Sequence, residues 1–163
     1  MINAIFEYLA GIDKLFAVFI VSMFPIVELR GAIPLGVGLG LEFYKVYLVS
    51  VLGNMLPVPF VIMFIRPVIE YLKKIKLFEK SVKKFEQKTL NKSDKITKYK
   101  MLGLFIFVAI PLPGTGAWTG AALAGLMNMR LKTSVPSIFF GVVTAGIIMS
   151  LVSHGVFNVI FGI

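Results

Sequence analysis

The amino-acid sequence predicts an all-α membrane protein that enters the bilayer with several segments. Three observations predict this class: four long apolar stretches, a hydrophobic content of 58%, and a charge distribution dominated by one segment. Residues 66–100 contain 12 of the 17 basic and 4 of the 8 acidic side chains, so +8 of the net charge of +9 lies there. Soluble domains have about 25% charged residues, whereas this chain has 15%. An ordinary soluble globule and a disordered chain are therefore excluded, and nucleic acid is not an expected partner.

The composition also limits the chemistry that the chain can perform. It has no Cys and one His, so disulfides, thiolate nucleophiles and Cys-based metal sites are excluded. No Ser/His/Asp grouping and no metal-ligand spacing is present in the sequence. We therefore expect no enzymatic activity, no cofactor and no bound metal.

Two of the four apolar stretches are interrupted by Pro and Gly. The first, Asp13–Leu41, contains the block Glu28–Gly36, and the third, Met101–Met129, contains Pro111, Pro113, Gly114 and Gly116. Proline removes a backbone donor and glycine tolerates non-helical dihedral angles, so each stretch should form two half-helices around a loop. The sequence leaves open whether these are re-entrant hairpins or interrupted spans. The other two stretches, Val46–Ile65 and Thr133–Ile163, are expected to be unbroken spans.

The two interrupted stretches suggest a duplication. Ala-Ile-Pro-Leu occurs at Ala32–Leu35 and again at Ala109–Leu112, and in both places an unbroken apolar stretch follows. We expect one membrane domain, residues 1–163, with a first repeat (13–65), a linker (66–100) and a second repeat (101–163). Interrupted segments at matching places in two halves are typical of inverted-repeat transporters.

The basic residues predict the topology. Loops rich in Lys and Arg remain in the cytoplasm, so residues 66–100 should lie on the cytoplasmic side of the cytoplasmic membrane. Arg130 and Lys132 also fall inside if Met101–Met129 is a hairpin, which favours hairpins over interrupted spans.

The linker itself has an amphipathic pattern. Apolar residues recur three or four positions apart from Val68 to Phe85, with lysines on the other faces. This pattern predicts a helix over Pro67–Leu90, with Pro67 in its first turn. A basic amphipathic helix beside a span is expected to bind anionic lipid of the inner leaflet.

Glu28 and Arg30 are the charges that neither the linker nor the span ends explain. A charge inside the bilayer costs about 2.5–3.5 kcal/mol on insertion scales, so it usually faces a cavity or a partner. In an unwound loop both side chains could face one cavity, where Glu28 would exchange a proton and Arg30 would contact an anionic group. Alternatively, the two form a salt bridge or extend to an interface.

The second interruption has the composition of an anion site. Backbone N–H groups of residues 114–117 precede an expected half-helix, whose N-terminus attracts negative charge. We therefore assign substrate contact to Arg30 and to the second interruption, whose residues are Pro111, Pro113, Gly114, Thr115, Gly116, Trp118 and Thr119. A hairpin tip that only lets helices pass closely is the alternative.

Other polar and small residues are expected to serve packing. The pairs Gly36/Gly40, Gly116/Gly120, Ala121/Gly125 and Gly141/Ala145 have the spacing that lets helices approach closely, within a chain or between two copies. Asn54 and Asn128 are expected to form hydrogen bonds between helices, and His154 to lie at an interface or to relay protons. A chain with so few helices is expected to form a homodimer.

The block Glu28–Gly36, with Pro111–Gly120 and Ala124-Gly125 downstream, resembles the small multidrug export protein family over nearly the whole chain. The layout is also similar to the DedA (VTT-domain) superfamily. That resemblance implies two inverted re-entrant hairpins, a cytoplasmic amphipathic segment, and translocation of polyprenyl-phosphate or phospholipid head groups with proton-dependent tolerance of drugs and pH. The superfamily's acidic residue would be Glu28. Its arginines near the second hairpin have no counterpart, because Ile110–Gly125 contains no Arg.

These observations favour a proton-coupled transporter of an amphipathic or anionic substrate, such as a drug-like compound or a phosphate-bearing lipid carrier. An energy-independent lipid scramblase and a non-transporting membrane adaptor are the alternatives. Collapse of the proton gradient would separate the first two, because scrambling would continue without it.

Overall fold

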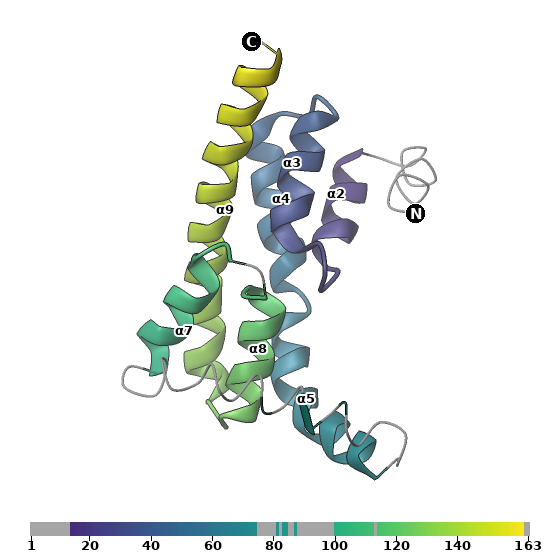
Figure 1. Cartoon of the computed structure of the whole chain (residues 1–163), viewed down its shortest axis with the longest axis vertical. Coiled ribbons are helices and arrows are strands. Elements are labelled where there is room, and N and C mark those ends of the chain that lie inside the picture. Colours follow the sequence, from purple (N-terminus) through teal and green to yellow (C-terminus); the bar gives the residue numbers. More distant parts are fainter. Residues whose placement is uncertain are drawn as a thin grey trace. The chain divides into compact units, whose positions relative to one another are not determined.

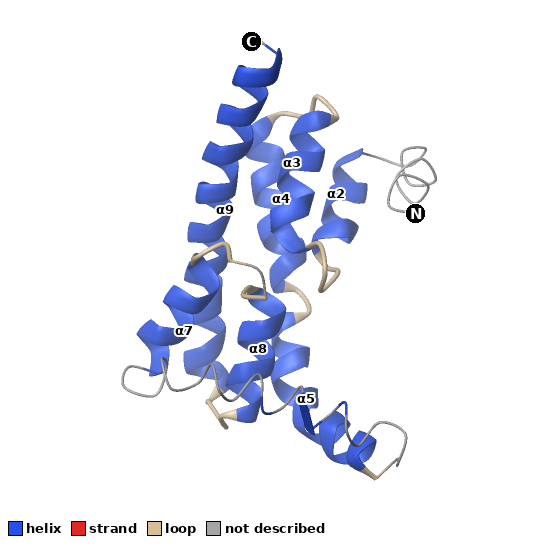
Figure 2. Cartoon of the chain, in the orientation of Figure 1, coloured by secondary structure: helices blue, strands red, loops and turns tan. Residues whose placement is uncertain are grey.

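The computed structural model describes residues 14–74, the single positions 81, 83, 84 and 87, residues 100–112 and residues 114–161 (Figure 1). The regular structure in these ranges is helical (Figure 2). The described residues form the helices α2 (Lys14–Ser22), α3 (Glu28–Gly38), α4 (Phe43–Met55), α5 (Val58–Lys73), α7 (Lys100–Ala109), α8 (Ala117–Leu126) and α9 (Leu131–Phe161). The all-α prediction is confirmed for this part of the chain.

The helices form two compact units. The first combines the described residues up to Leu56 with those from Val142 onward, and the second contains those from Pro57 to Gly141. Helix α9 therefore contributes its first part to the second unit and its remainder to the first unit. Each unit takes helices from both halves of the sequence.

In the first unit, α2, α3 and α4 pack against one another. Gly36 permits the closest approach, because a Cβ added there would lie 2.7 Å from Val46 Cγ1 and 3.1 Å from Val18 Cγ2. The core beside it is fully apolar, with Ala17, Val18, Ile33 and Val46 completely buried. The small residue at position 36 thus sets how α3 meets both neighbours, as its spacing predicted.

The first apolar stretch is broken, but not where the sequence analysis placed the break. The chain leaves the helix over Met23–Val27, and the block Glu28–Gly36, expected to unwind, belongs to α3. Pro25 lies in this turn, which we call the first tip, whereas Pro34 is accommodated inside α3. The prediction of an unwound Glu28–Gly36 block is therefore wrong, and the prediction of two half-helices is confirmed.

In the second unit, α8 packs against α5 and α7. A Cβ on Gly125 would lie 2.7 Å from the Ile62 carbonyl oxygen, so the α8 backbone directly contacts the α5 backbone. Ile65, Ile69 and Leu72 of α5 pack with Leu126 at the end of α8. Gly120 and Gly141 likewise allow α8 and α9 to approach Val108 of α7.

The third apolar stretch is interrupted where the sequence predicted. Helix α7 ends at Ala109 and α8 begins at Ala117, so residues 110–116 form the second tip. Gly114 (φ 76°) and Gly116 (φ 136°) have backbone angles that only glycine adopts readily. Pro113 lies outside the described residues.

Helices α3 and α8 end in the same way. After α3, Gly40 has φ 74° and donates to the Val37 carbonyl, while Leu41 donates to the Gly36 carbonyl. After α8, Asn128 has φ 56° and donates to the Gly125 carbonyl, while Met129 donates to the Ala124 carbonyl. Both are Schellman motifs. Asn128 therefore ends α8. The sequence analysis had assigned it only an interhelical hydrogen bond.

The matching ends reveal an internal correspondence. Helix, tip, helix, Schellman turn and long helix occur in the same order twice, and α4 and α9 begin 88 positions apart, at Phe43 and Leu131. With this offset Glu28 corresponds to Gly116; Glu28 is the first residue of α3, Gly116 directly precedes α8, and both have a positive φ. Ala32–Leu35 lies inside α3, whereas Ala109–Leu112 spans the end of α7 and the second tip. The four matching letters are therefore not structurally equivalent.

The stretch Val46–Ile65 is divided by a turn at Leu56-Pro57 between α4 and α5. Both turn residues keep helical dihedral angles, so Phe43–Leu72 forms one apolar run of 30 residues. Pro57 and Pro59 cannot donate backbone hydrogen bonds, which explains the local interruption.

Pro67 lies within α5 and does not begin a new helix, so the predicted boundary is wrong. The predicted amphipathic helix beyond residue 74 lies outside the described residues, except for exposed helical positions 81, 83, 84 and 87.

Within the described part of the chain, two helical runs, Phe43–Leu72 and Leu131–Ser153, are long and apolar enough to cross a membrane. The predicted span over Thr133–Ile163 is thereby confirmed as a long apolar helix. Large apolar side chains on these runs are exposed, including Leu52 (62%), Phe60 (57%) and Leu151 (69%). Continuous exposed apolar surface of this kind is suited to lipid and not to water.

Arg66 connects α5 to the end of α8. Its Nη2 donates to the Leu126 carbonyl at 2.9 Å, which is one of the C-terminal carbonyls that α8 cannot satisfy internally. We expect Arg66→Ala to lower the free energy of unfolding by about 1–2 kcal/mol, measured as a lower Tm in detergent. Lys74→Ala, an exposed cation at the end of the same helix, should leave Tm unchanged. Equal Tm values for Arg66→Ala and the parent would refute this role.

Candidate proton and substrate sites

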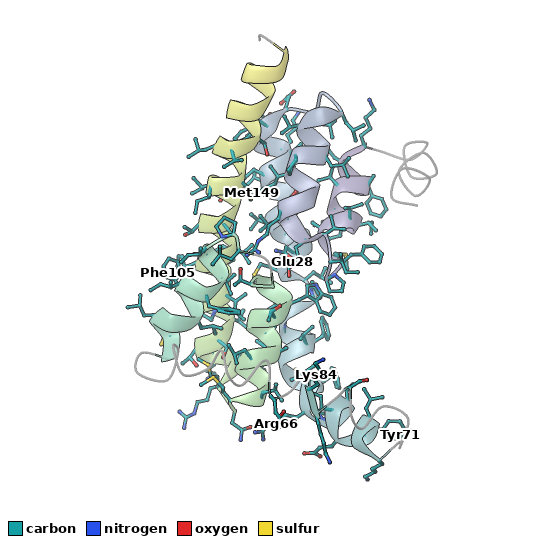
Figure 3. All side chains as sticks on the ribbon, in the orientation of Figure 1. Glu28, Arg66, Tyr71, Lys84, Phe105 and Met149 are labelled. Atoms are coloured by element: carbon teal, nitrogen blue, oxygen red, sulfur yellow. The ribbon has the colours of Figure 1, made fainter. Side chains whose placement is uncertain are left out.

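Glu28 lies at the start of α3, directly after the first tip (Figure 3). Its side chain is only 5% exposed. Its φ is 50°, a left-handed value that is uncommon for a residue with a Cβ, and its N–H donates to the Phe24 carbonyl at 2.9 Å. A buried carboxyl and local backbone strain coincide at this residue, and such strain is concentrated at functional sites.

Arg30 follows two residues later in the same helix. It is partly buried and interacts electrostatically with Glu28. Because successive helical positions point in different directions, the expected loop with both side chains facing one cavity is not formed. The structure therefore brings the two charges together as neighbours on α3.

Two further polar residues lie on α4, one helical turn apart. Ser50 is completely buried and Asn54 is 1% exposed. The Ser50 hydroxyl and both polar atoms of the Asn54 side chain have no hydrogen-bond partner. The predicted interhelical hydrogen bond of Asn54 is therefore not formed in this structure. Ser50 was missed by the sequence analysis, although two polar residues four apart in an uncharged span were a usable signal.

The second tip is held together by Thr115. Its hydroxyl lies 2.8 Å from the carbonyl oxygens of both Ile110 and Leu112, to which it can donate, and the Leu112 N–H donates to it at 3.2 Å. The Thr115 N–H donates to the Leu112 carbonyl at 3.1 Å. One backbone donor and the hydroxyl expected for substrate are thus used within the tip itself.

The remaining predicted contact residues surround the start of α8. Gly114 is exposed, Gly116 and Ala117 are buried, and Trp118 and Thr119 are partly buried in the first turn. Pro111 is partly buried and precedes this turn. These residues belong to the second unit, whereas Glu28 and Arg30 belong to the first. His154 lies in α9, and its side chain is outside the described set.

Comparison with known proteins gives a single kind of match. No curated protein and no solved structure matches the chain. The family model described as "Putative small multi-drug export protein" matches residues 28–148, which include Glu28, Arg30, both α4 polar residues and the whole second tip. A match over most of the chain, together with two apolar runs of membrane-spanning length, shows that the chain belongs to this family of small multidrug export membrane proteins.

Proposed function

We propose that the protein is a secondary exporter of the cytoplasmic membrane that couples the movement of an amphipathic or anionic substrate to protons. Family membership supports export. The observation that supports proton coupling most strongly is the burial of the Glu28 carboxyl at the strained start of α3. A buried carboxyl changes charge at low cost only if it can take up and release a proton.

Arg30 is proposed to attract the anionic part of the substrate. A guanidinium cannot lose its proton under physiological conditions and offers several donors to phosphate or carboxylate. When Glu28 is protonated, it no longer offsets the positive charge of Arg30, so the attraction of Arg30 for an anion increases. Protonation and substrate binding are thereby linked without any covalent step, so the proposal requires neither an enzyme active site nor a cofactor.

The second tip is proposed as an additional substrate contact within the second unit. Gly114 is exposed beside the N-terminus of α8, which favours negative charge. Trp118 in the first turn of α8 offers a large amphipathic surface to the substrate. Thr115 is assigned to shaping this tip and not to direct contact, because its hydroxyl is already bonded.

We further propose that both helix–tip–helix segments are re-entrant hairpins of an inverted repeat. Both tips expose large apolar side chains, Phe24 and Ile26 in the first and Ile110 and Leu112 in the second, which suits an apolar surrounding. The correspondence at an offset of 88 residues supports a duplication. The same arrangement puts Arg66, Arg130 and Lys132 on the cytoplasmic side. A homodimer and binding of anionic lipid by the basic linker complete the proposal.

The test is transport into proteoliposomes under an imposed pH gradient, with a short-chain fluorescent prenyl phosphate as probe and an amphipathic dye in parallel. We expect gradient-dependent uptake that is lowered roughly tenfold or more by Arg30→Ala, because a charge-assisted contact is lost. Lys45→Ala is the matched control, since Lys45 is a cation of the same unit that pairs with Glu42 at 3.0 Å. Uptake that continues after a protonophore collapses the gradient would identify a scramblase and overturn the proposal.

A further inference from the structure

Ser50 and Asn54 on α4 are buried polar side chains without a hydrogen-bond partner, as is Ser150 on α9. The other buried serines, Ser22, Ser134, Ser137 and Ser153, each donate their hydroxyl to a backbone carbonyl three or four residues earlier. The Ser50 hydroxyl has no such bond, and Asn54 has neither its donor nor its acceptor satisfied. Buried polar atoms without partners are costly, and in native proteins they indicate a partner that is present only in another state or as a ligand.

The helix register places Glu28 at the depth of Asn54. Helices α3 and α4 are connected by a tight turn and run in opposite directions (Figure 1), and Gly36 of α3 contacts Val46 of α4. Moving eight residues from Gly36 back to Glu28, and eight residues from Val46 forward to Asn54, covers about 12 Å along each helix. Ala32 of α3 and Ser50 of α4 lie on the turns between these two levels. The rows Glu28–Ala32–Gly36 and Asn54–Ser50–Val46 therefore run side by side.

A second contact supports the same register. A Cβ on Gly53 would lie 2.5 Å from the Phe19 carbonyl oxygen, near the end of α2. Helix α2 ends at Ser22, and the first tip then leads into Glu28. Gly53, the residue before Asn54, therefore lies beside the end of α2, which leads into the first tip.

The second half of the chain provides a comparison in which the same arrangement has no polar cluster. At the offset of 88 residues, Glu28, Ser50 and Asn54 correspond to Gly116, Ile138 and Val142. Ile138 and Val142 are both completely buried. The helix–tip–helix arrangement thus packs without polar groups at these positions, so packing does not explain why the first half has all three.

We infer that the Glu28 carboxyl turns to Asn54, assisted by Ser50, in a step of the transport cycle that differs from the state described here, in which neither Asn54 nor Ser50 has a partner. An amide can donate from Nδ2 to a carboxylate and can accept at Oδ1 from a carboxylic acid, and a hydroxyl can do both. Asn54 thereby positions the carboxyl and allows it to exist either charged or neutral inside the bilayer. This inference rests on the proposed proton coupling and adds a positioning residue to it.

Among the described residues of the first unit, the other charged and titratable groups lie beside Glu28 on α3 or at the far ends of α2 and α4. Arg30 is the charged neighbour on α3, and α2 has Lys14 at its far end. On α4 the titratable side chains Tyr44, Lys45 and Tyr47 lie toward its start, away from Asn54, and Tyr47 donates to the Val143 carbonyl at 3.2 Å. Among described side chains from Val142 onward none is charged.

The test variants are Asn54→Val and Ser50→Ile, which install the residues that the second half of the chain already uses. Because the atoms removed have no partner, Tm in detergent should be equal to or higher than that of the parent, whereas a structural role would lower it. Proton-driven uptake of the prenyl phosphate probe should fall at least tenfold in Asn54→Val. Ser150→Ala, which removes another buried hydroxyl without a partner, should transport normally.

The decisive readout is infrared difference spectroscopy of the full chain in lipid bilayers between low and high pH. The carbonyl-stretch band of a protonated carboxyl that is lost in Glu28→Gln identifies Glu28. In Asn54→Val this band should move to higher frequency, because the acid has lost its acceptor. An unmoved band with parental uptake would overturn the inference. If Glu28→Gln itself transports normally under a pH gradient, the proposed function fails instead.

Discussion

We expect proton-driven uptake by reconstituted protein to fall by roughly a hundredfold in Glu28→Gln, because the variant keeps the shape of the side chain and loses its ability to exchange a proton. Glu28 is 5% exposed and lies at a backbone position with φ 50°, so it is positioned by its surroundings and is not a surface charge. The measurement is initial uptake of the prenyl phosphate probe under a fixed pH gradient.

Glu42→Gln is the matched control for the same chemical change. Glu42 precedes α4, is exposed, and pairs with Lys45 at 3.0 Å. Its pKa lies below the ordinary value because it forms a hydrogen bond with Tyr44 and, secondly, with Lys45. Glu42 is therefore ionised throughout the neutral pH range and contributes no proton exchange there. Loss of uptake in both variants would point to a general effect of charge removal, contrary to the role given to Glu28.

Gly125→Ala is expected to destabilise the second unit by about 1–3 kcal/mol, since a methyl group cannot be accommodated where two backbones touch. The added Cβ would lie 2.7 Å from the Ile62 carbonyl oxygen, an atom that cannot rotate away as a side chain can. Thermal unfolding in detergent, followed by circular dichroism, measures the effect as a lower Tm.

Gly155→Ala applies the same substitution in open space. Gly155 lies in α9, and a Cβ there would meet no atom within 4 Å. Alanine is the better helix former by about 0.5–1 kcal/mol, so Tm should rise slightly. A decrease in Tm of similar size for both variants would show that the contact between α5 and α8 is not the cause.

The sequence predicted the helical class, the second tip and the small residues between helices because each depends on local chemistry. Pro111, Gly114 and Gly116 lie within six residues of one another, and together they disfavour a continuous helix through this segment. The first tip was misplaced because a Pro-Gly-rich block was given more weight than Pro25. Pro34 lies inside α3, and its block remains helical when packed against α2 and α4.

The candidate site could be predicted only in part. Glu28 and Arg30 were recognisable because charges inside an apolar stretch are rare. The relation of Glu28 to Ser50 and Asn54 depends on the register of α3 against α4, which Gly36 and Val46 determine in three dimensions. The predicted repeat rested on four matching letters, whereas the helix ends and Schellman turns match at a different offset of 88 residues. Similarity to the DedA superfamily remains a prediction.

The most direct test of proton coupling through Glu28 is whether substrate can move protons. Proteoliposomes that contain a pH-sensitive dye and start at equal pH on both sides receive a gradient of the prenyl phosphate probe. The parent protein should change the luminal pH as the probe moves, and Glu28→Gln should not. Probe movement by the parent without any pH change, or an equal pH change with Glu28→Gln, would contradict proton coupling through this carboxyl.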